Sequence, residues 1–440
     1  MLLSSNPLSD VLTTIKTSEP MASPQPKRTL GLFEGFGVEL EYMIVSKKDL
    51  LVLPITDKLI YDEVGAYISD VELGEIAWSN ELVLHVVELK TQGPVKSLEG
   101  LHCKFQEHVQ KINQMLEKYD AMLLPTGAHP TMNPDTDTQL WPHEHNAVYE
   151  AYNRIFNCKG HGWANLQSTH LNLPFANDEE FAKLHAAIRF VLPILPALSA
   201  SSPIMDGKVT GMFDSRLEVY RHNQGKIPSI TGKVVPEAVF SKKDYEEQIL
   251  NKMYADVAPY DPEGTLQEEF LNSRGAIARF ERNTIEIRLL DIQESPVADL
   301  AIVQATVSVI QALIGERWVK LQELMAFDEN RLSRILVQVI SNGQETILTD
   351  QEFLSCFGFE CKGNCTAGEL WRHLAKECIV LEEQPEVQHA LNVILSRGNL
   401  AKRILDATKL NPDTKTIEKV YTQLAQCLQK GGVFLPEKPC

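Results

Sequence analysis

A strict alternation of apolar and polar side chains in residues 36–45 constrains the structure more than any other feature of the chain. Glu39 and Glu41 lie two residues apart, and the positions between and beside them are apolar. Those apolar residues are Phe36, Val38, Leu40, Tyr42 and Ile44. Because successive side chains of a β-strand point to opposite faces, a strand here places both acids on one face and a hydrophobic core on the other.

The same alternation returns in two later segments. Glu286 and Arg288 alternate with three aliphatic residues, and Ser168, His170 and Asn172 alternate with a threonine and two leucines. One such strand would fit two solvated glutamates at the edge of a sheet. Three of them predict a sheet whose polar face lines a site.

A fourth extended segment, residues 81–89, carries Glu81 and Glu88. These two acids are separated by an odd number of positions, so a regular strand would turn them to opposite faces. A β-bulge, or a strand that starts after Glu81, would be needed to aim both carboxylates into one site.

Six residues of these segments are candidate ligands for metal ions: Glu39, Glu41, Glu81, Glu88, His170 and Glu286. A set of carboxylates with one imidazole suits a hard divalent cation, Mg2+ or alternatively Mn2+, rather than zinc or copper. Converging acids repel one another, so either cations are bound among them or the acids do not converge.

The overall composition excludes several classes of partner. The chain has 440 residues, of which 44% are hydrophobic and 23% charged, so it can bury a sizeable core. A net charge of −17 argues against a nucleic acid or an anionic membrane as partner, because phosphates require a basic face. No apolar run reaches the roughly 18 residues that span a bilayer.

We expect a cytoplasmic protein. Residues 1–30 are rich in Ser, Thr and Pro and predict a flexible lead-in without a signal peptide, in which Met21 is an alternative start. Eight cysteines in such a chain predict reduced thiols. Cys356, Cys361, Cys365 and Cys378 lack the paired C-x2-C spacing of a zinc knuckle, so free thiols are favoured over a structural zinc site.

The remaining sequence predicts helices around the sheet. Apolar residues at a 3.6-residue period predict a helix over 97–119, capped by Ser97, and a helix opened by Asp178 that two prolines kink or end. A further helix is expected from Ser295-Pro296 to about residue 324. Residues 132–163 predict a lid or substrate loop, and residues 207–237 a loop.

Together these elements predict an α+β protein with a mostly antiparallel sheet. Its core would span residues 31–325, followed by an all-helical appendage over 326–440 that includes a capping box from Thr366 to Glu369. The sequence contains neither of the usual glycine-rich nucleotide cradles, G-x-x-x-x-G-K-[ST] or G-x-G-x-x-G after a strand.

The chain resembles the glutamate–cysteine ligase type 2 family, carboxylate–amine ligases of the glutamine synthetase superfamily. The resemblance rests on segments that follow one another in family order over residues 31–315. They are Gly37-Val38-Glu39-Leu40-Glu41, Asn80-Glu81, Glu88-Leu89-Lys90-Thr91, Gly127-Ala128-His129-Pro130, Thr169-His170-Leu171-Asn172, residues 195–203 with Gly207, Thr210-Gly211, Ser215-Arg216, and residues 284–291. The chain departs from the family at Ser168, where members often carry a second histidine, and at Met205, where an aromatic residue is common.

The resemblance implies a curved, mostly antiparallel sheet of the glutamine synthetase-like catalytic type, which holds ATP and two or three Mg2+ ions. It implies that the six candidate ligands bind the metal and that Arg288, beside Glu286, meets the transferring phosphoryl group. Arg216 is a candidate clamp for phosphate or a substrate carboxylate, with an ordinary loop salt bridge as an equal alternative. For Arg221 the salt bridge is the better interpretation. We place His129 and His143-Glu144-His145 outside the predicted site.

The resemblance therefore implies a ligase that uses ATP and Mg2+ to convert a side-chain carboxylate, the γ-carboxyl of glutamate, into an acyl phosphate and joins it to an amine. Cysteine is the leading amine, which would place the chain in glutathione biosynthesis. The expected partners are small molecules, with neither nucleic acid nor membrane, and an oligomer is compatible. A guanidino phosphotransferase and a non-catalytic ligand-binding protein on the same scaffold stay open as alternatives, although idle clustered carboxylates would destabilise the latter.

Overall fold

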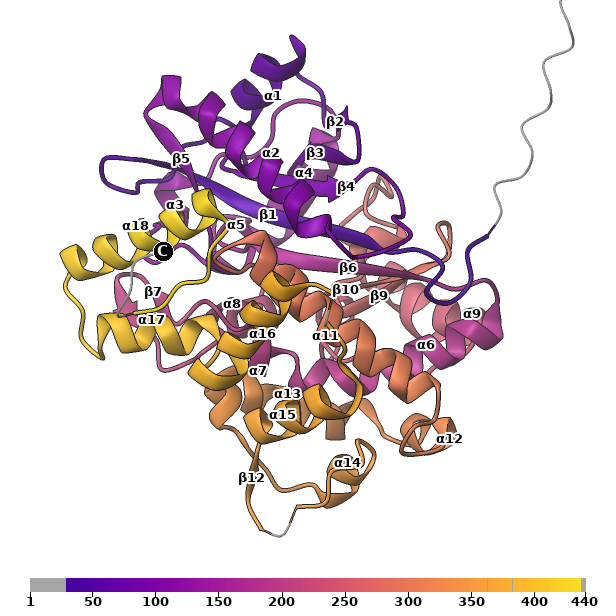
Figure 1. Ribbon diagram of the computed structural model, residues 1–440. Coiled ribbons are helices and arrows are strands. Elements are labelled where there is room, and N and C mark those ends of the chain that lie inside the picture. The colour runs from indigo at the N-terminus through magenta and orange to yellow at the C-terminus, as the bar shows by residue number, and fades with distance from the viewer. Residues whose placement is uncertain (1–28, 362, 382, 437–440) are drawn as a thin grey trace, which may run out of the picture.

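A mostly antiparallel sheet crosses the molecule and carries helices around it (Figure 1). This computed structural model describes residues 29–361, 363–381 and 383–436, so residues 1–28 of the expected lead-in lie outside the described part. Within these ranges the main sheet has eight strands in the order β2-β3-β4-β1-β6-β10-β9, and β5 pairs with β1 beside this path. Its pairings are antiparallel.

The main sheet consists of β1 (Gly37–Ser46), β2 (Asp70–Leu73), β3 (Ile76–Asn80), β4 (Val86–Thr91), β5 (Ala121–Leu124), β6 (Ser168–Pro174), β9 (Ala276–Arg279) and β10 (Thr284–Asp291). Two short hairpins are formed by β7 (Ile204–Met205) with β8 (Lys208–Val209), and by β11 (Ile347–Leu348) with β12 (Cys365–Thr366).

The helices are α1 (Thr56–Val64), α2 (Leu101–Leu116), α3 (Pro134–Asp137), α4 (Asn146–Phe156), α5 (His161–Ala164), α6 (Asp178–Val191), α7 (Pro196–Ser199), α8 (Ser215–Tyr220), α9 (Lys242–Tyr245), α10 (Asn251–Val257), α11 (Pro296–Ile314), α12 (Leu321–Met325), α13 (Glu329–Asn342), α14 (Gln351–Ser355), α15 (Ala367–Cys378), α16 (Pro385–Arg397), α17 (Leu400–Thr408) and α18 (Thr414–Lys430). The fold is α+β, as the sequence predicts.

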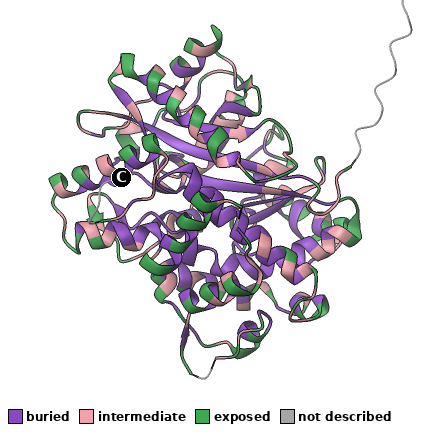
Figure 2. Ribbon diagram, in the orientation of Figure 1, coloured by how far each residue is buried: buried purple, intermediate pink, exposed green. Residues whose placement is uncertain are grey.

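The apolar face of the sheet forms the main hydrophobic core. Val38, Leu40, Leu171 and Ile287 are fully buried there. They belong to one cluster with the apolar faces of α2, α6 and α11. Figure 2 shows the central strands buried and the exposed residues on the outer turns of the surrounding helices. The apolar residues of the alternating segments therefore face the core, and the polar residues between them face the opposite side of the sheet.

The register of the strands sets which polar side chains meet on the other face. Glu39 on β1 lies opposite His170 on β6 and Lys90 on β4. Glu41, two residues further along β1, lies opposite Glu88 on β4. Directly paired strand residues have Cβ atoms about 5 Å apart, so this register gathers side chains from three strands into one polar cluster.

The segment 81–89 is not a single strand. β3 ends at Asn80, and β4 begins only at Val86. Glu81 thus lies in the turn that joins β3 to β4, which frees its side chain from strand alternation. This is the second of the two solutions that the odd spacing of Glu81 and Glu88 allows, and β3 itself was not predicted.

Several predicted helix limits are wrong. α2 begins at Leu101 with Gly100 at its N-cap, because the hydroxyl of Ser97 instead accepts from the backbone of Glu99 in the preceding turn. The expected loop over residues 132–163 contains α3, α4 and α5, and the next expected loop contains α8. The helix that starts at Pro296 ends at Ile314, and α12 follows as a separate helix.

Within the described residues, α11 is long and apolar enough to cross a membrane by length and composition, with a mean hydropathy of 1.8 over an 18-residue window. This corrects the expectation that no segment of this length is sufficiently apolar. Because 78% of that window is buried inside the protein, α11 has the environment of a core helix.

The C-terminal helices pack against the sheet layer in two hydrophobic clusters. α13, α15 and α16 share the main core, whereas α17 and α18 form a second cluster with residues of β1, β4 and β5. Leu336 and Trp371 belong to the same hydrophobic cluster as the sheet. The indole Nε1 of Trp371 donates to the carbonyl of Ile194, 2.8 Å away. The hairpin of β11 and β12 shows that the region is not all-helical, and the boundary near residue 325 stays a prediction.

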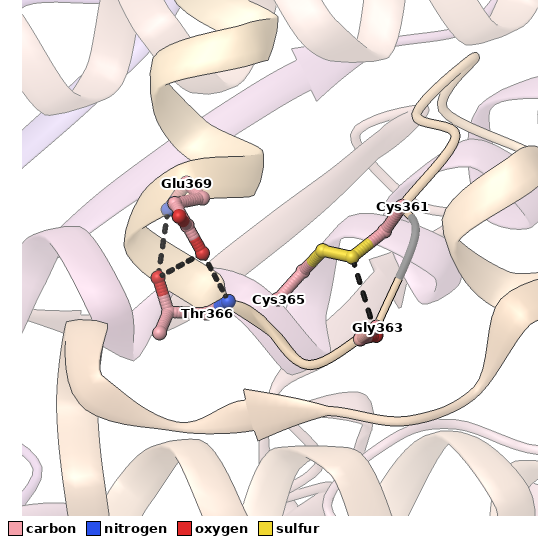
Figure 3. The surroundings of a disulfide bond; sticks show 5 residues. All are labelled: Cys361, Gly363, Cys365, Thr366 and Glu369. Atoms are coloured by element: carbon pink, nitrogen blue, oxygen red, sulfur yellow. Dashed lines mark hydrogen bonds between the residues drawn. A yellow bond between two sulfur atoms is a disulfide. The ribbon is translucent and has the colours of Figure 1, made fainter.

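The structure pairs Cys361 with Cys365 in a disulfide (Figure 3), so the expectation of reduced thiols is wrong for these two residues. Their Cα atoms lie 6.2 Å apart, within the range that a disulfide requires. The predicted capping box follows at once, with Thr366 and Glu369 exchanging hydrogen bonds at the start of α15. Among the described residues, the groups placed to hold a metal ion contain no cysteine.

Candidate active site

A cavity of about 560 Å³ opens over the polar face of the sheet. Of the six predicted ligands, Glu41, Glu81 and His170 line it, whereas Glu39, Glu88 and Glu286 lie close by without lining it. Arg216 and Arg288 also line it. Other lining residues come from α4, α5 and α8 and from the short 3-10 helix Glu269–Leu271, which carries Phe270. The structure therefore brings the polar faces of the predicted strands to one hollow.

Five of the six predicted metal ligands form two groups that share Glu88. Glu39, Glu88 and His170 make one group, and Glu41, Glu81 and Glu88 make the other. In each group the ligand atoms lie within 4.8 Å of one another. A cation in each group would have the shared carboxylate of Glu88 between them, an arrangement that suits a pair of divalent ions.

The charges in this cluster are only partly balanced within the protein, since Nζ of Lys90 lies 3.4 Å from Glu88. Burial, together with the neighbouring carboxylates of Glu41 and Glu88, raises the pKa of Glu81 well above its ordinary value. Burial and the carboxylate of Glu39 raise the pKa of Glu88 to about 7. These acids therefore hold protons near neutral pH unless positive charge replaces them. Oxygen-rich donors of this kind fit Mg2+ or Mn2+, so the residues present match the metal that the sequence implies.

His170 is held at both ring nitrogens. Its Nδ1 lies 2.8 Å from Oε2 of Glu39, and its Nε2 lies 2.9 Å from the hydroxyl of Ser168. Burial opposes a charge on the ring, but the carboxylates of Glu41 and Glu39 raise the pKa of His170. The imidazole is thus fixed in orientation before any ligand arrives.

Glu286, the sixth predicted ligand, lies on the same face but is held by two guanidinium groups. Nε of Arg288 is 3.1 Å from one of its carboxylate oxygens, and Nε of Arg279 is 3.2 Å from the other. Although burial disfavours its charge, Arg288 and Arg279 lower the pKa of Glu286 to about 2. Among the described residues it belongs to neither three-residue metal group. Glu286 therefore orients two arginines toward the cavity, whether or not it also meets a cation.

Arg216 forms a salt bridge, one of the two interpretations that the sequence left open for it. Its side chain is buried, and its guanidinium group donates to the backbone carbonyl of Arg288 at 3.0 Å. It also lies 3.4 Å from a carboxylate oxygen of Asp291. Its contacts are thus an ion pair and the backbone of β10, although its edge still borders the cavity. Arg216 holds the strand that presents Arg288.

A register shift in β10 explains why Asp291 faces Arg216. Between Ile287 and Leu290 the pairing with β6 skips, so that Asp291 lies opposite Ser168. A regular strand would have turned Leu290 toward the site and Asp291 toward the core. Alternation alone could not reveal this residue, because the extra position resets it.

An aromatic wall lines part of the cavity and was not predicted residue by residue. Tyr149 and Tyr152 from α4, Trp163 from α5, and Phe270 line the cavity. Tyr152 and Trp163 pack with ring centroids 5.3 Å apart. The segment that the sequence assigned to a lid or substrate loop therefore does line the cavity, as helices, and Arg279 and His145 line it as well.

The other residues that the sequence placed outside the site are mostly structural. His129 is buried with Nε2 2.8 Å from the carbonyl of Leu50, and burial lowers its pKa to about 4. Arg221 donates to Glu218 at 2.7 Å within the α8 segment. His143 contacts Asp57 rather than a metal cluster.

Comparison with known sequences gives a consistent family. The profile of glutamate–cysteine ligase family 2 matches residues 35–423, which includes most of the C-terminal helices that the resemblance of the sequence motifs had left out. An uncharacterized protein of Archaeoglobus fulgidus is 34% identical over 407 residues, covering 91% of this chain and 100% of that protein. A protein of Enterobacter sp., provisionally named glutamate–cysteine ligase 2, is 25% identical over 336 residues, covering 72% of this chain and 80% of its own.

Comparison with solved structures shows the same type of fold. The bifunctional glutathione synthetase of Pasteurella multocida superposes with a TM-score of 0.54 at 14% identity, covering 91% of this chain and 52% of that one. The glutamate–cysteine ligase of Francisella tularensis, solved in complex with AMP, superposes with a TM-score of 0.52 at 13% identity, covering 92% of this chain and 90% of that one.

Proposed function

Because this chain belongs to glutamate–cysteine ligase family 2, we propose that it is a carboxylate–amine ligase that uses ATP and a divalent cation. We propose glutamate as the acid, activated at its γ-carboxyl, and cysteine as the first amine to test. The solved relatives that share the fold include a glutamate–cysteine ligase bound to AMP, which supports a nucleotide as co-substrate.

The observation that carries the proposal is the pair of three-residue metal groups that share Glu88, next to a cavity of about 560 Å³. Bound Mg2+ or Mn2+ would offset the negative charge of the ATP phosphates and polarise the γ-phosphoryl group. Glu39, Glu41, Glu81, Glu88 and His170 would hold these ions. A chain without such chemistry would gain nothing from burying acids that repel one another.

Arg288 is the residue that we assign to the transferring phosphoryl group. It borders the cavity, and Glu286 fixes its Nε at 3.1 Å, which leaves the rest of the fork to face the ligand. A planar guanidinium group in a fixed position stabilises charge that develops on phosphoryl oxygens. We assign Arg216 the role of holding the carbonyl of Arg288, so it supports the same group from behind.

The proposed reaction has two steps. An oxygen of the substrate carboxylate bonds to the γ-phosphorus of ATP while the bond to ADP breaks, giving an acyl phosphate. The amine nitrogen then attacks the acyl carbon, the bond to phosphate breaks, and the amine loses a proton as the amide forms. The aromatic wall of the cavity would limit the entry of water, which competes with the amine for the acyl carbon.

Incubation with ATP, Mg2+, glutamate and a panel of amines tests the proposal. We expect release of inorganic phosphate together with an amide identified by mass, with cysteine the first candidate amine. Glu88→Gln should abolish both signals, whereas Glu72→Gln, which changes a glutamate on the edge strand β2 that lies outside both metal groups, should leave them unchanged. A phosphorylated guanidine as the stable product, or ATP binding without turnover, would contradict the ligase.

A further inference from the structure

Ser168 contacts one member of each metal group, Glu41 in one and His170 in the other. Its backbone N–H and its hydroxyl both donate to Oε2 of Glu41, at 2.6 and 2.8 Å. The same hydroxyl lies 2.9 Å from Nε2 of His170. Ser168 is only 3% exposed, so bulk water does not compete for these contacts.

The protons of this contact chain can be assigned. A serine hydroxyl carries one proton, and that proton goes to the carboxylate of Glu41. The contact between Ser168 and His170 must then be donated by the ring, so Nε2 carries a proton. A protonated ring nitrogen has no lone pair for a metal ion, which leaves Nδ1 as the nitrogen that can bind one.

The position of Nδ1 fits this assignment. It lies 2.8 Å from Oε2 of Glu39, a member of the same metal group. In this structure the contact is a hydrogen bond from Nδ1–H to Glu39, and a bound cation would take the place of that proton. Two neighbouring ligands of an octahedral Mg2+ at roughly 2.1 Å are about 3 Å apart, so the same spacing also fits two adjacent ligands of one ion. Nε2 faces Ser168 instead and lies 3.6 Å from the nearer oxygen of Glu41.

We propose that Ser168 is a positioning residue that holds the Nε2–H of His170 and the carboxylate of Glu41 together, so that His170 binds the cation through Nδ1. The proposal rests on the proposed function only in taking the two groups as metal sites. Ser168 couples these sites, because the hydroxyl that orients the ligand of one also holds a carboxylate of the other. A histidine at this position could not donate and accept through a single atom in this way.

Manganese binding, rather than catalysis, tests the proposal. Mn2+ is titrated into the protein and free ion is measured by electron paramagnetic resonance. Outer partners of metal ligands typically contribute 10- to 100-fold in affinity, so Ser168→Ala should weaken binding by about that factor. Ser168→Thr, which keeps the hydroxyl, should restore most of it.

Thr169→Val is the matched control. Thr169 is the next residue of the same strand, is equally buried, and donates to Asp299 on the core side over 2.7 Å. The valine removes a comparable hydrogen bond from the opposite face of β6, so it should leave Mn2+ affinity unchanged. If Thr169→Val weakened Mn2+ binding as much as Ser168→Ala does, the effect of Ser168 would be explained by the stability of β6 alone, and the proposal would be overturned.

A second experiment identifies the nitrogen that binds the metal in the wild-type protein. Its result does not depend on whether a variant folds. Histidine labelled with 15N at Nδ1 or at Nε2 is incorporated, and pulsed paramagnetic resonance detects which label is bonded to Mn2+. Bonding through Nδ1 supports the proposal. Bonding through Nε2, or unchanged affinity in Ser168→Ala, overturns it while leaving the ligase proposal intact. Failure of the wild-type protein to bind Mn2+ at all would overturn both.

Discussion

The pKa of Glu88 makes a quantitative prediction about metal binding. Burial and the carboxylate of Glu39 raise this pKa to about 7, so below that pH the side chain is protonated and a cation must displace the proton. At pH 5 a carboxyl with a pKa of 7 is ionised in about one molecule in 100, whereas one with an ordinary pKa is mostly ionised. Divalent affinity should therefore fall at least about 100-fold from pH 8 to pH 5.

The assay is calorimetric titration of Mn2+ into the protein at pH 5, 6, 7 and 8. Repeating the titration at pH 6 in two buffers of different ionisation enthalpy counts the protons released, and we expect about one or more per metal ion. Glu88→Gln removes the titrating group, so it should bind more weakly at pH 8 but lose much of the pH dependence. Glu72→Gln serves as the control.

An affinity that changes less than about threefold between pH 8 and pH 5 would refute this reasoning, because a 100-fold effect follows from the pKa alone. It would mean that Glu88 is already ionised before a cation binds, with Lys90, 3.4 Å away, as its counter-charge.

Four further predictions concern other parts of the structure. Burial raises the pKa of Asp299 to about 8, so the folded protein loses stability as the pH rises from the ordinary pKa of an aspartate toward 8. In urea unfolding at pH 9, Asp299→Asn should therefore be more stable than the wild-type protein by up to several kcal/mol. Each tenfold change in an ionisation constant corresponds to about 1.4 kcal/mol. Arg288→Lys should lower kcat about 100-fold while the dissociation constant for ATP changes little, since lysine keeps the charge but loses the fork; equal kcat would remove Arg288 from the reaction. A Cβ at Gly127 would lie 2.5 Å from Oδ2 of the buried Asp291, so Gly127→Ala should destabilise the fold by about 1–3 kcal/mol, and an unchanged melting temperature would contradict that packing. Glu286→Gln should abolish turnover; retained amide formation would show that orienting the two arginines is not required.

The sequence predicted which residues share the polar face of the sheet, but it did not predict the irregularity within β10. Period-two alternation correctly placed Glu39, Glu41 and His170 on one side, because a strand buried on its other face leaves no freedom in register. The same rule could not have placed Asp291, because a register shift resets the alternation before it, and a shift of this kind has no signal in a single sequence.

Residues on helices and loops across from the sheet were harder to predict. Tyr152 and Trp163 line the cavity because α4 and α5 fold over the sheet, and their aromatic character alone is equally typical of a core. Arg279 reaches Glu286 only through the pairing of β9 with β10. Arg216 was left with two equal interpretations, a phosphate clamp and a salt bridge. The structure shows the salt bridge, to Asp291, and Arg216 also lines the cavity, so the clamp stays a prediction.

The claim on which the account depends is that separated acids gather around divalent cations at the floor of one cavity. The most direct measurement is anomalous diffraction from crystals grown with Mn2+ and a non-hydrolysable ATP analogue. We predict peaks about 2.0–2.3 Å from the carboxylates of the two groups that share Glu88, with the analogue's phosphates beside Arg288. Peaks that lie away from these carboxylates, or none in the cavity, would contradict the account.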